Sequence, residues 1–138
     1  MNAMEISRTG LDVEWRRLEV IADNLANLGT TRTALGEPFR AMRLVSGPRF
    51  ANLMGTTTAA DLRGVETLAL EPVATAPRRV HEPGHPHADA EGYVTYPGID
   101  HAAEMTLMVT TARAYEANLV AMAAAKQMYA KAMELGRR

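Results

Sequence analysis

The sequence contains no cysteine, which excludes disulfides, thiol nucleophiles and thiolate metal ligands. Aromatic residues are also scarce, with one Trp, two Phe and four Tyr, so the large side chains that dominate many compact cores are few. The apolar content comes mainly from Ala, Met, Leu and Val. This composition favours an elongated, mainly α-helical protein over a dense β-sandwich.

Neither sign of charge predominates and no long apolar run occurs. The chain has 15 Lys and Arg against 16 Asp and Glu, which excludes the basic surface expected of a nucleic-acid-binding protein. The most apolar window, 117–125, is far shorter than the roughly 20 residues of a membrane-spanning helix. The opening residues MNAMEISRTG have neither the basic nor the apolar part of a signal peptide. We therefore expect no nucleic-acid partner, no membrane span and no cleaved signal peptide.

One cluster contains residue types that bind metals: His81, His85, His87 and His101, with Glu82 and Asp89. Pro83, Gly84 and Pro86 interrupt it, so no regular helix or strand spacing would present the imidazoles together. The sequence has no phosphate-binding glycine loop, no nucleophile elbow and no basic-aromatic surface. We expect solvated loop histidines, no metal site, no cofactor and no enzymatic activity.

An amphipathic helix is predicted near the N-terminus, because apolar residues recur there at heptad spacing. The residues of this stripe are Leu11, Trp15, Leu18, Ile21, Ala22, Leu25 and Leu28. Glycine costs about 1 kcal/mol inside a helix relative to alanine. The helix therefore either begins near Leu11 or has a weak start that includes Gly10.

A longer helix is predicted from Asp100 to Gly136. Asp100 is placed to cap its start after the Pro97-Gly98 turn, and Gly136 marks its end. Two heptad seams run along it for roughly four heptads, within a helix of about 50 Å. The seam residues are Met105, Ala112, Leu119, Lys126 and Met133, and Met108, Tyr115, Met122 and Tyr129. Lys126 interrupts the first seam, where it either sets the register of a partner helix or extends its ammonium group to water.

The segment between the helices is rich in turn-forming residues, because 29–98 contains all seven prolines and most of the glycines. Short strands are predicted at 39–45, 65–70, 78–81 and 93–96, and an exposed loop at 55–60. The predicted fold is mainly α, with long terminal helices pairing as an antiparallel coiled coil. The predicted domains are 1–28 together with 100–138 as the coiled coil, and 29–99 as a loop-rich insert.

The two helices can pair within the chain, with neighbouring copies, or both. One seam covers only a narrow stripe of each helix, so much of the Met- and Ala-rich surface would stay uncovered in a single chain. The pattern therefore indicates neighbouring subunits. The alternative is a monomer that buries these residues in its own core.

The first helix ends in an unusual stretch, DNLANLGTTR, at residues 23–32. The amides of Asn24 and Asn27 can bond exposed carbonyl groups or a neighbouring chain. We expect Gly29 to adopt the left-handed conformation of a helix cap. Small residues at Ala22 and Ala26 allow another helix to approach closely.

This stretch resembles the N-terminal signature of the flagellar axial proteins, commonly written A-N-N-L-A-N-x-N-T-x-G, although Asp23 and Gly29 stand where asparagine is usual. The segments TTRTALGEPFR, PGHPHADAEGYVTYPGID and the closing helix with ARAYEAN resemble the rod members of that family. The residues that carry the motifs are Asn24, Ala26, Asn27, Thr30, Thr31, Arg32, Gly36, Pro38, Arg113, Tyr115, Glu116 and Asn118.

The resemblance implies a structural subunit of the proximal rod of the bacterial flagellar basal body. Such subunits pass through the flagellar type III export apparatus without a cleaved signal and assemble helically with other rod proteins in the periplasmic space. The rod is a hollow shaft that encloses the export channel and carries torque from the membrane ring complex. The implied partners are further copies and other rod proteins. A soluble coiled-coil adaptor or export chaperone of the same apparatus is the alternative, and an enzyme comes third.

Overall fold

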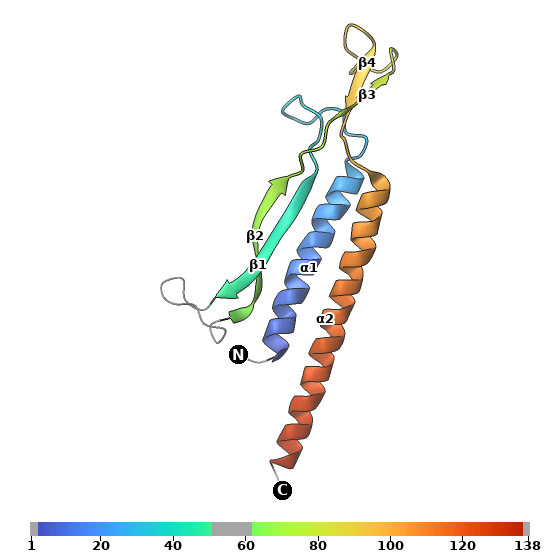
Figure 1. Cartoon of the computed structure of the whole chain (residues 1–138). Helices are drawn as coiled ribbons and strands as arrows, with labels where there is room; N and C mark the ends of the chain where they lie inside the picture. Colours follow the sequence, from blue (N-terminus) through green and yellow to red (C-terminus); the bar gives the residue numbers. More distant parts are fainter. Residues whose placement is uncertain (1–2, 51–61, 137–138) are drawn as a thin grey trace. The chain divides into compact units, whose positions relative to one another are not determined.

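The computed structural model describes residues 3–50 and 62–136. Along the chain, one long helix comes first, four strands follow, and a second long helix comes last (Figure 1). These elements are α1 (Ala3–Ala26), β1 (Met42–Phe50), β2 (Leu62–Pro72), β3 (Arg78–His81), β4 (Tyr93–Tyr96) and α2 (His101–Leu135). The prediction of a mainly helical chain with short strands in a middle insert is confirmed. The loop predicted at 55–60 lies outside the described residues.

The starts of the two helices can be compared with the sequence expectations. Asp100 caps α2 as predicted, because its Oδ1 accepts hydrogen bonds from the backbone N–H groups of Ala102 at 2.9 Å and Ala103 at 3.2 Å. The first helix begins at Ala3, so Gly10 lies well inside it. Of the two starts left open by the sequence, the one that includes Gly10 is correct.

The four strands form two separate two-stranded sheets, β1 with β2 and β3 with β4. The second sheet is antiparallel, with Arg78 opposite Tyr96 and His81 opposite Tyr93, and both of its strands lie at the predicted residues. Strand β1 is displaced toward the C-terminus of its predicted range, and β2 is longer than predicted at both ends. Strand propensity marks the apolar centre of a strand, whereas the pairing between strands decides where it ends.

The chain forms two compact units whose boundaries fall within α1, β1, β2 and α2. Unit 1 comprises Met1–Leu18, Leu44–Ala69 and Thr110–Arg138, and unit 2 comprises Glu19–Arg43 and Leu70–Val109.

Within unit 1, the hairpin of β1 and β2 lies on one side of α1 and α2 lies on the other (Figure 1). Arg17 Nη2 donates to Ser46 Oγ at 2.9 Å on the hairpin side. On the other side the rings of Trp15 and Tyr115 lie 6.2 Å apart between centroids. Gly10 lies beside Asn118. An earlier residue of α1 therefore contacts a later residue of α2 than Trp15 does. The two helices of unit 1 are therefore antiparallel.

Within unit 2, the buried apolar residues are few and come from different segments. Val94 on β4 is fully buried, and Ile21 and Ala41 are almost fully buried. The backbone N–H of Val73 donates to the carbonyl of Ala41 at 2.8 Å, which ties the end of β2 to the residue before β1. A polar junction around Asn24 completes the interior of this unit.

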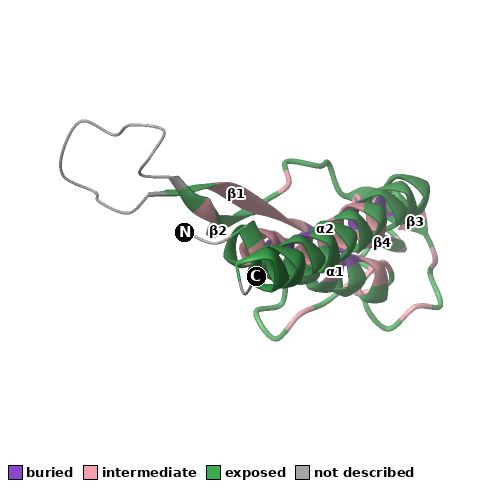
Figure 2. Cartoon of the chain, turned by 90° about the horizontal axis from the view of Figure 1, so that it is seen from below, coloured by how far each residue is buried: buried purple, intermediate pink, exposed green. Residues whose placement is uncertain are grey.

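The buried core is thin in both units. In the described part of unit 1, Val13 and Ala125 are the buried apolar residues, and Thr111 is a buried polar residue. Most of the α2 ribbon is exposed (Figure 2). Large apolar side chains on that helix, including Val120 and Leu135, stand in solvent. A chain of this kind leaves apolar surface for a partner.

Candidate assembly interface

The residues predicted to pack along α2 divide into covered and uncovered sets. In unit 1, Ala112, Tyr115 and Met122 are half-buried. Leu119 is 47% exposed and Met133 is 55% exposed, so the described residues leave about half of each uncovered. Tyr129 is likewise exposed. In unit 2, Met108 is half-buried and Met105 is exposed. Their roles in packing between subunits stay predictions.

The predicted residues of α1 are more uniformly covered. Ile21 is buried, whereas the leucines of the stripe are half-buried: Leu11, Leu18, Leu25 and Leu28. Trp15 is 55% exposed although its ring contacts Tyr115. The indole therefore covers one edge of the helix pair and offers its other face to solvent.

In unit 1, α2 extends past the point where α1 begins. Gly10 lies beside Asn118 in the antiparallel pair, so Ala3, the first residue of α1, stands near the level of Ala125. Ala125 is the last buried residue of α2, and every residue from 126 to 135 is exposed. This overhang is about 15 Å long at 1.5 Å per residue.

The positions of α2 that are buried or touch α1 in unit 1 include small and polar residues that the apolar pattern did not select. Thr111 and Ala125 are buried and Asn118 lies against Gly10, so these three residues follow one another at intervals of seven. Their spacing of seven residues could have indicated a helix-packing face. The pattern was not recognised because it was sought among large apolar residues, and these side chains are polar or small.

A buried polar junction joins the end of α1 to the start of β1 in unit 2. Asn24 is fully buried, and its amide pairs with both backbone groups of Met42. Its Oδ1 accepts from the Met42 N–H at 2.9 Å, and its Nδ2 donates to the Met42 carbonyl at 2.9 Å. The Asn24 amide thus bonds both the N–H and the C=O of Met42, as a residue of a neighbouring β-strand would.

Glu104 brings the start of α2 into the same junction. Its carboxylate is almost fully buried and accepts from Asn24 Nδ2 at 3.2 Å and from Arg43 Nη1 at 3.1 Å. Arg43 Nη2 donates to its other oxygen, so the ion pair is bidentate. Glu104 is the acidic residue of the first turn of α2, and no local sequence pattern indicated a partner for it or a role for Arg43. Their sequence separation of 61 residues explains why no local pattern could pair them.

The end of α1 is closed by asparagine and threonine side chains. Asn27 Nδ2 donates to the Asp23 carbonyl at 2.9 Å, as predicted for an amide beside exposed carbonyl groups. Thr30 Oγ1 then donates to Asn27 Oδ1 at 2.9 Å. The prediction that Gly29 adopts a left-handed conformation is wrong, because the described glycines with positive φ are Gly36, Gly64 and Gly92. The Asn27–Thr30 bonds close the helix without a left-handed residue.

The remaining N-terminal motif residues lie in the loop after α1. Gly36 has a φ of 84°, and its N–H donates to the Thr33 carbonyl at 2.9 Å in a tight turn. Thr31 Oγ1 lies 2.8 Å from His87 Nδ1, which connects this loop to the segment between β3 and β4. Arg32 is exposed, as are Ala26 on α1 and Arg113 and Glu116 on α2.

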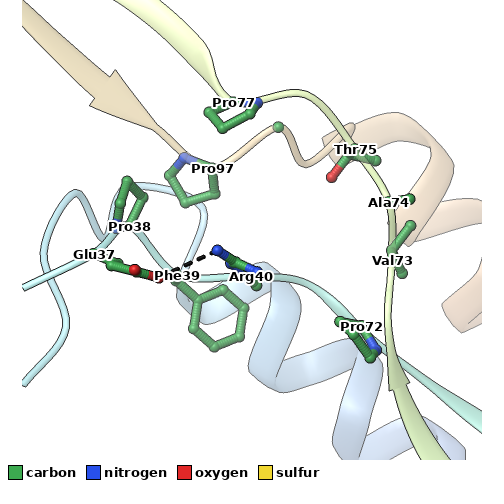
Figure 3. Close-up of a pocket in the computed structure, with 11 residues that line it drawn as sticks. Glu37, Pro38, Phe39, Arg40, Pro72, Val73, Ala74, Thr75, Pro77 and Pro97 are labelled. Carbon is green, nitrogen blue, oxygen red and sulfur yellow. Dashed lines mark hydrogen bonds and ion pairs between the residues drawn. The ribbon is translucent and has the colours of Figure 1, made fainter. Parts of the chain in front are cut away.

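A pocket of about 470 Å³ in unit 2 has four prolines in its lining. Figure 3 shows Pro38, Pro72, Pro77 and Pro97 around it, with Phe39 at one side. Its charged side chains, Glu37 and Arg40, are exposed and pair with each other at 3.2 Å. The rest of its lining consists of apolar side chains, Thr75 and Gly98.

The histidines of the insert make local contacts. The rings of His85 and His87 lie 5.3 Å apart, and the His87 N–H donates to His85 Nδ1 at 3.0 Å. Asp89 accepts backbone hydrogen bonds from Tyr93 and Glu91 and pairs with Arg79 at 2.6 Å. The backbone N–H of Tyr93, followed by Arg79, lowers the pKa of Asp89. In the described ranges, no group of three or more His, Asp or Glu residues is arranged to hold a metal ion.

None of the described helices is long and apolar enough to cross a membrane.

Comparison with known proteins places these features in one family. The model of the flagellar basal body rod FlgEFG protein C-terminal region matches residues 90–135, which include all of α2. Proteins named flagellar basal-body rod protein FlgC are similar along nearly the whole chain. The FlgC of Salmonella typhimurium is 33% identical over 99% of this chain and 97% of its own length, and that of Bacillus subtilis has the same figures. The FlgC of Borreliella burgdorferi is 30% identical over 97% of this chain and 95% of its own length. The chain therefore belongs to the FlgC family of flagellar basal-body rod proteins.

Proposed function

We propose that this structural rod protein is a subunit of the proximal rod, which assembles helically with other rod proteins into a hollow drive shaft. The shaft transmits torque and encloses the export channel. The observation that carries the proposal is similarity to FlgC proteins over 97% to 99% of the chain. Family membership alone supports a structural role in the basal-body rod.

The apolar surface of α2 supports assembly through that helix. Leu119, Val120 and Met133 are each about half exposed or more, and the overhang from 126 to 135 has no cover within the described chain. Contacts between different faces of identical subunits produce open helical filaments when the rotation does not close. Exposed apolar faces on one elongated helix suit such contacts, because successive neighbours can bind along its length.

The proposed inner layer consists of the terminal segments 1–28 and 100–138, packed as an antiparallel coiled coil. The insert, 29–99, would form the outer layer. Support comes from the antiparallel contact of α1 and α2 in unit 1 and from the heptad spacing of their apolar residues. The proposed packing residues are Leu11, Trp15, Leu18, Ile21, Leu25, Leu28, Met105, Met108, Ala112, Tyr115, Leu119, Met122, Tyr129 and Met133.

The proposed partners are further copies of the chain, other flagellar rod proteins and the type III export apparatus, with the membrane ring complex contacted indirectly. Export would proceed without a cleaved signal peptide, and the assembled protein would reside in the periplasmic part of the basal body. Nucleic acid is not among the proposed partners, because the net charge of −1 provides no electrostatic attraction for it.

The test uses a strain whose chromosomal copy is deleted and replaced by the wild-type gene or by a variant. We expect the wild-type chain to be present in purified basal bodies, and its deletion to abolish the rod and motility. Met133→Asp should reduce incorporation, because it puts a charge on the proposed apolar contact. Lys131→Asp is the matched control on the same exposed turn.

Two results would contradict the proposal. Rods of normal composition in the deletion strain would exclude a structural role in the rod. Recovery of the chain only in a soluble complex of fixed size, absent from basal bodies, would favour the adaptor or export-chaperone alternative.

A further inference from the structure

The turn at residues 33–37 in unit 2 presents one leucine to solvent. Leu35 is 91% exposed, more than any other large apolar side chain in the described part of the chain. The backbone N–H of Thr33 donates to the Glu37 carbonyl at 2.8 Å, and that of Gly36 donates to the Thr33 carbonyl at 2.9 Å. These bonds fix the turn, so Leu35 stands at the tip of a defined loop.

Single exposed leucines are common on protein surfaces, so Leu35 carries meaning only if the molecule has a surface that could receive it. Unit 2 has such a surface in the pocket of Figure 3, which we call the proline pocket. Four prolines line it: Pro38, Pro72, Pro77 and Pro97. Its volume of about 470 Å³ lies within the range of pockets that hold small molecules, so a leucine side chain fits. Proline side chains lose no rotamer freedom when they are covered, so this lining binds an apolar group without that entropic cost.

Leu35 does not fill the proline pocket of its own chain, because it is 91% exposed while Glu37, only two residues later, lines the pocket. Each copy therefore has one uncovered leucine and one pocket of matching chemistry. In an assembly that repeats the chain, the two occur in equal numbers. The occupant that these features favour is the Leu35 turn of a second copy.

Charge complementarity supports the same occupant. The rim of the proline pocket has one acid and one base, Glu37 and Arg40, which pair with each other in exposed positions. The turn that would enter has Arg32 three residues before Leu35 and Glu37 two residues after it, and both are exposed. Arg32 makes no ion pair among the described residues. A second copy thus brings one charge of each sign to a rim that has one of each sign, so each incoming charge can face an opposite one.

We propose that Leu35 of one copy inserts into the proline pocket of the next copy in the rod. The proposal rests on the proposed function, because only an assembly of repeated subunits holds the leucine and the pocket of different copies side by side. The leucine and the pocket are different surfaces, so the contact is heterologous and passes from copy to copy without closing on a pair. It connects the inserts, 29–99, and uses no residue of the terminal helices.

One leucine is too small an anchor to join free subunits. Its burial does not offset the translational and rotational freedom that two free molecules lose on association. Subunits that other rod contacts already hold together do not lose that freedom again, so the insertion takes place in the assembled rod. We therefore expect this contact in basal bodies and not between free chains.

Disulfide trapping in purified basal bodies tests the contact, and the absence of native cysteine makes each introduced thiol unique. The full-length chain receives Ala34→Cys, next to Leu35, together with Ala74→Cys in the pocket lining. A disulfide requires Cα atoms within about 7 Å, a separation that insertion of Leu35 would bring about between two copies. After oxidation we expect a ladder of linked chains longer than dimers, because every copy offers one thiol to each neighbour. Each single-cysteine variant should give no ladder.

The cross-link should depend on Leu35 itself. In the two-cysteine chain, Leu35→Asp should lower the linked fraction about tenfold, because it replaces an apolar contact by a buried charge. Leu35→Met should retain the ladder, since methionine keeps a similar volume. Leu70→Asp is the matched control, because Leu70 is a leucine of unit 2 that is 53% exposed and lies outside the turn and the pocket lining.

Four outcomes would overturn the inference: no linked chains, dimers alone, a ladder that Leu35→Asp leaves intact, or equal losses in Leu35→Asp and Leu70→Asp. Dimers alone would mean a reciprocal two-fold contact. If the first cysteine pair blocks incorporation, Ala34→Cys with Thr75→Cys provides a second pair across the same contact. A chain that enters basal bodies normally and never cross-links would refute only this contact. Absence of the wild-type chain from basal bodies would refute the proposed function, and this contact with it.

Discussion

Gly10 on α1 leaves room for the side chain of Asn118 on α2. A Cβ atom at Gly10 would lie 2.8 Å from Asn118 Oδ1 and 3.0 Å from its Cγ, closer than such atoms approach without a shift. Asn118 in turn donates from Nδ2 to the Ala114 carbonyl at 3.0 Å, which fixes its side chain along the helix. Glycine weakens an isolated helix, but at position 10 it lets α1 and α2 pack closely and places Gly10 opposite Asn118 in unit 1.

We predict that Gly10→Ala has different effects on the free energy of unfolding in two backgrounds. In the wild type, the gain of about 1 kcal/mol in helix propensity is offset by displacement of the Asn118 side chain. In an Asn118→Ala chain the added methyl group meets no obstacle, so Gly10→Ala should stabilise by about 1 kcal/mol. Urea denaturation of the four variants measures the coupling energy.

A coupling energy near zero would show that the close approach of Gly10 and Asn118 has no energetic consequence. Gly29→Ala provides the control pair with Asn118→Ala, because a Cβ at Gly29 has open space around it. No coupling is expected there.

Removing the amide of Asn24 should destabilise unit 2 by about 2–3 kcal/mol, because Asn24→Ala leaves the half-buried Met42 without a partner for its N–H. Asn27→Ala should cost less, about 0.5–1 kcal/mol, since its exposed side chain bonds only near the helix end. Hydrogen exchange of the Met42 amide gives the local reading. An unchanged exchange rate in Asn24→Ala would contradict the assigned pairing.

Replacing only one member of the ion pair between Arg43 and Glu104 should strongly lower the free energy of unfolding. Arg43→Met should destabilise by about 3 kcal/mol, because it leaves a buried carboxylate without its counter-charge. Replacing both residues with methionine should cost less than the sum of the single changes. Arg40→Met is the control, because the exposed pair of Arg40 and Glu37 is worth little. Equal losses at the two arginines would argue against a buried pair.

Acid should loosen the segment between β3 and β4 through Asp89. The backbone N–H of Tyr93 and the Arg79 guanidinium hold the pKa of Asp89 below its ordinary value of 3.8. A lowered pKa in the folded chain means that the stabilisation is fully present above pH 3.8 and is lost as the pH falls through the lowered pKa. The Tyr93 amide resonance should therefore shift in NMR spectra at acidic pH.

Asp89→Asn should remove that acid transition from the Tyr93 resonance while leaving the spectrum near neutral pH similar. Persistence of the same transition in the variant would assign it to another carboxylate, such as Glu91, which lies 3.6 Å from Arg79.

The elements whose signals are local were predictable from the sequence. Asp100 caps α2 because its carboxylate accepts hydrogen bonds from N–H groups two and three residues away. Strands β3 and β4 lie at the predicted residues, where strand-forming residues stand between turn-forming ones. The family motifs are also local, so they indicated the family before any contact was known. Each of these features depends on residues within a few positions of one another.

The tertiary structure decided which of these residues meet. The heptad pattern of α2 marked its apolar residues, but Thr111 and Ala125 are buried as well, and Asn118 lies against Gly10 of α1. The role of Gly29 was predicted wrongly, since Asn27 and Thr30 close the helix instead.

The polar junction around Asn24 separates what the sequence determines from what the tertiary structure decides. The sequence by itself determined that asparagines stand at the end of α1 and that an acid stands in the first turn of α2. It could not determine that Asn24 would pair with Met42, or that Glu104 would be buried against Arg43. Those contacts join residues 18 and 61 positions apart, and only the folded chain brings them within hydrogen-bond distance.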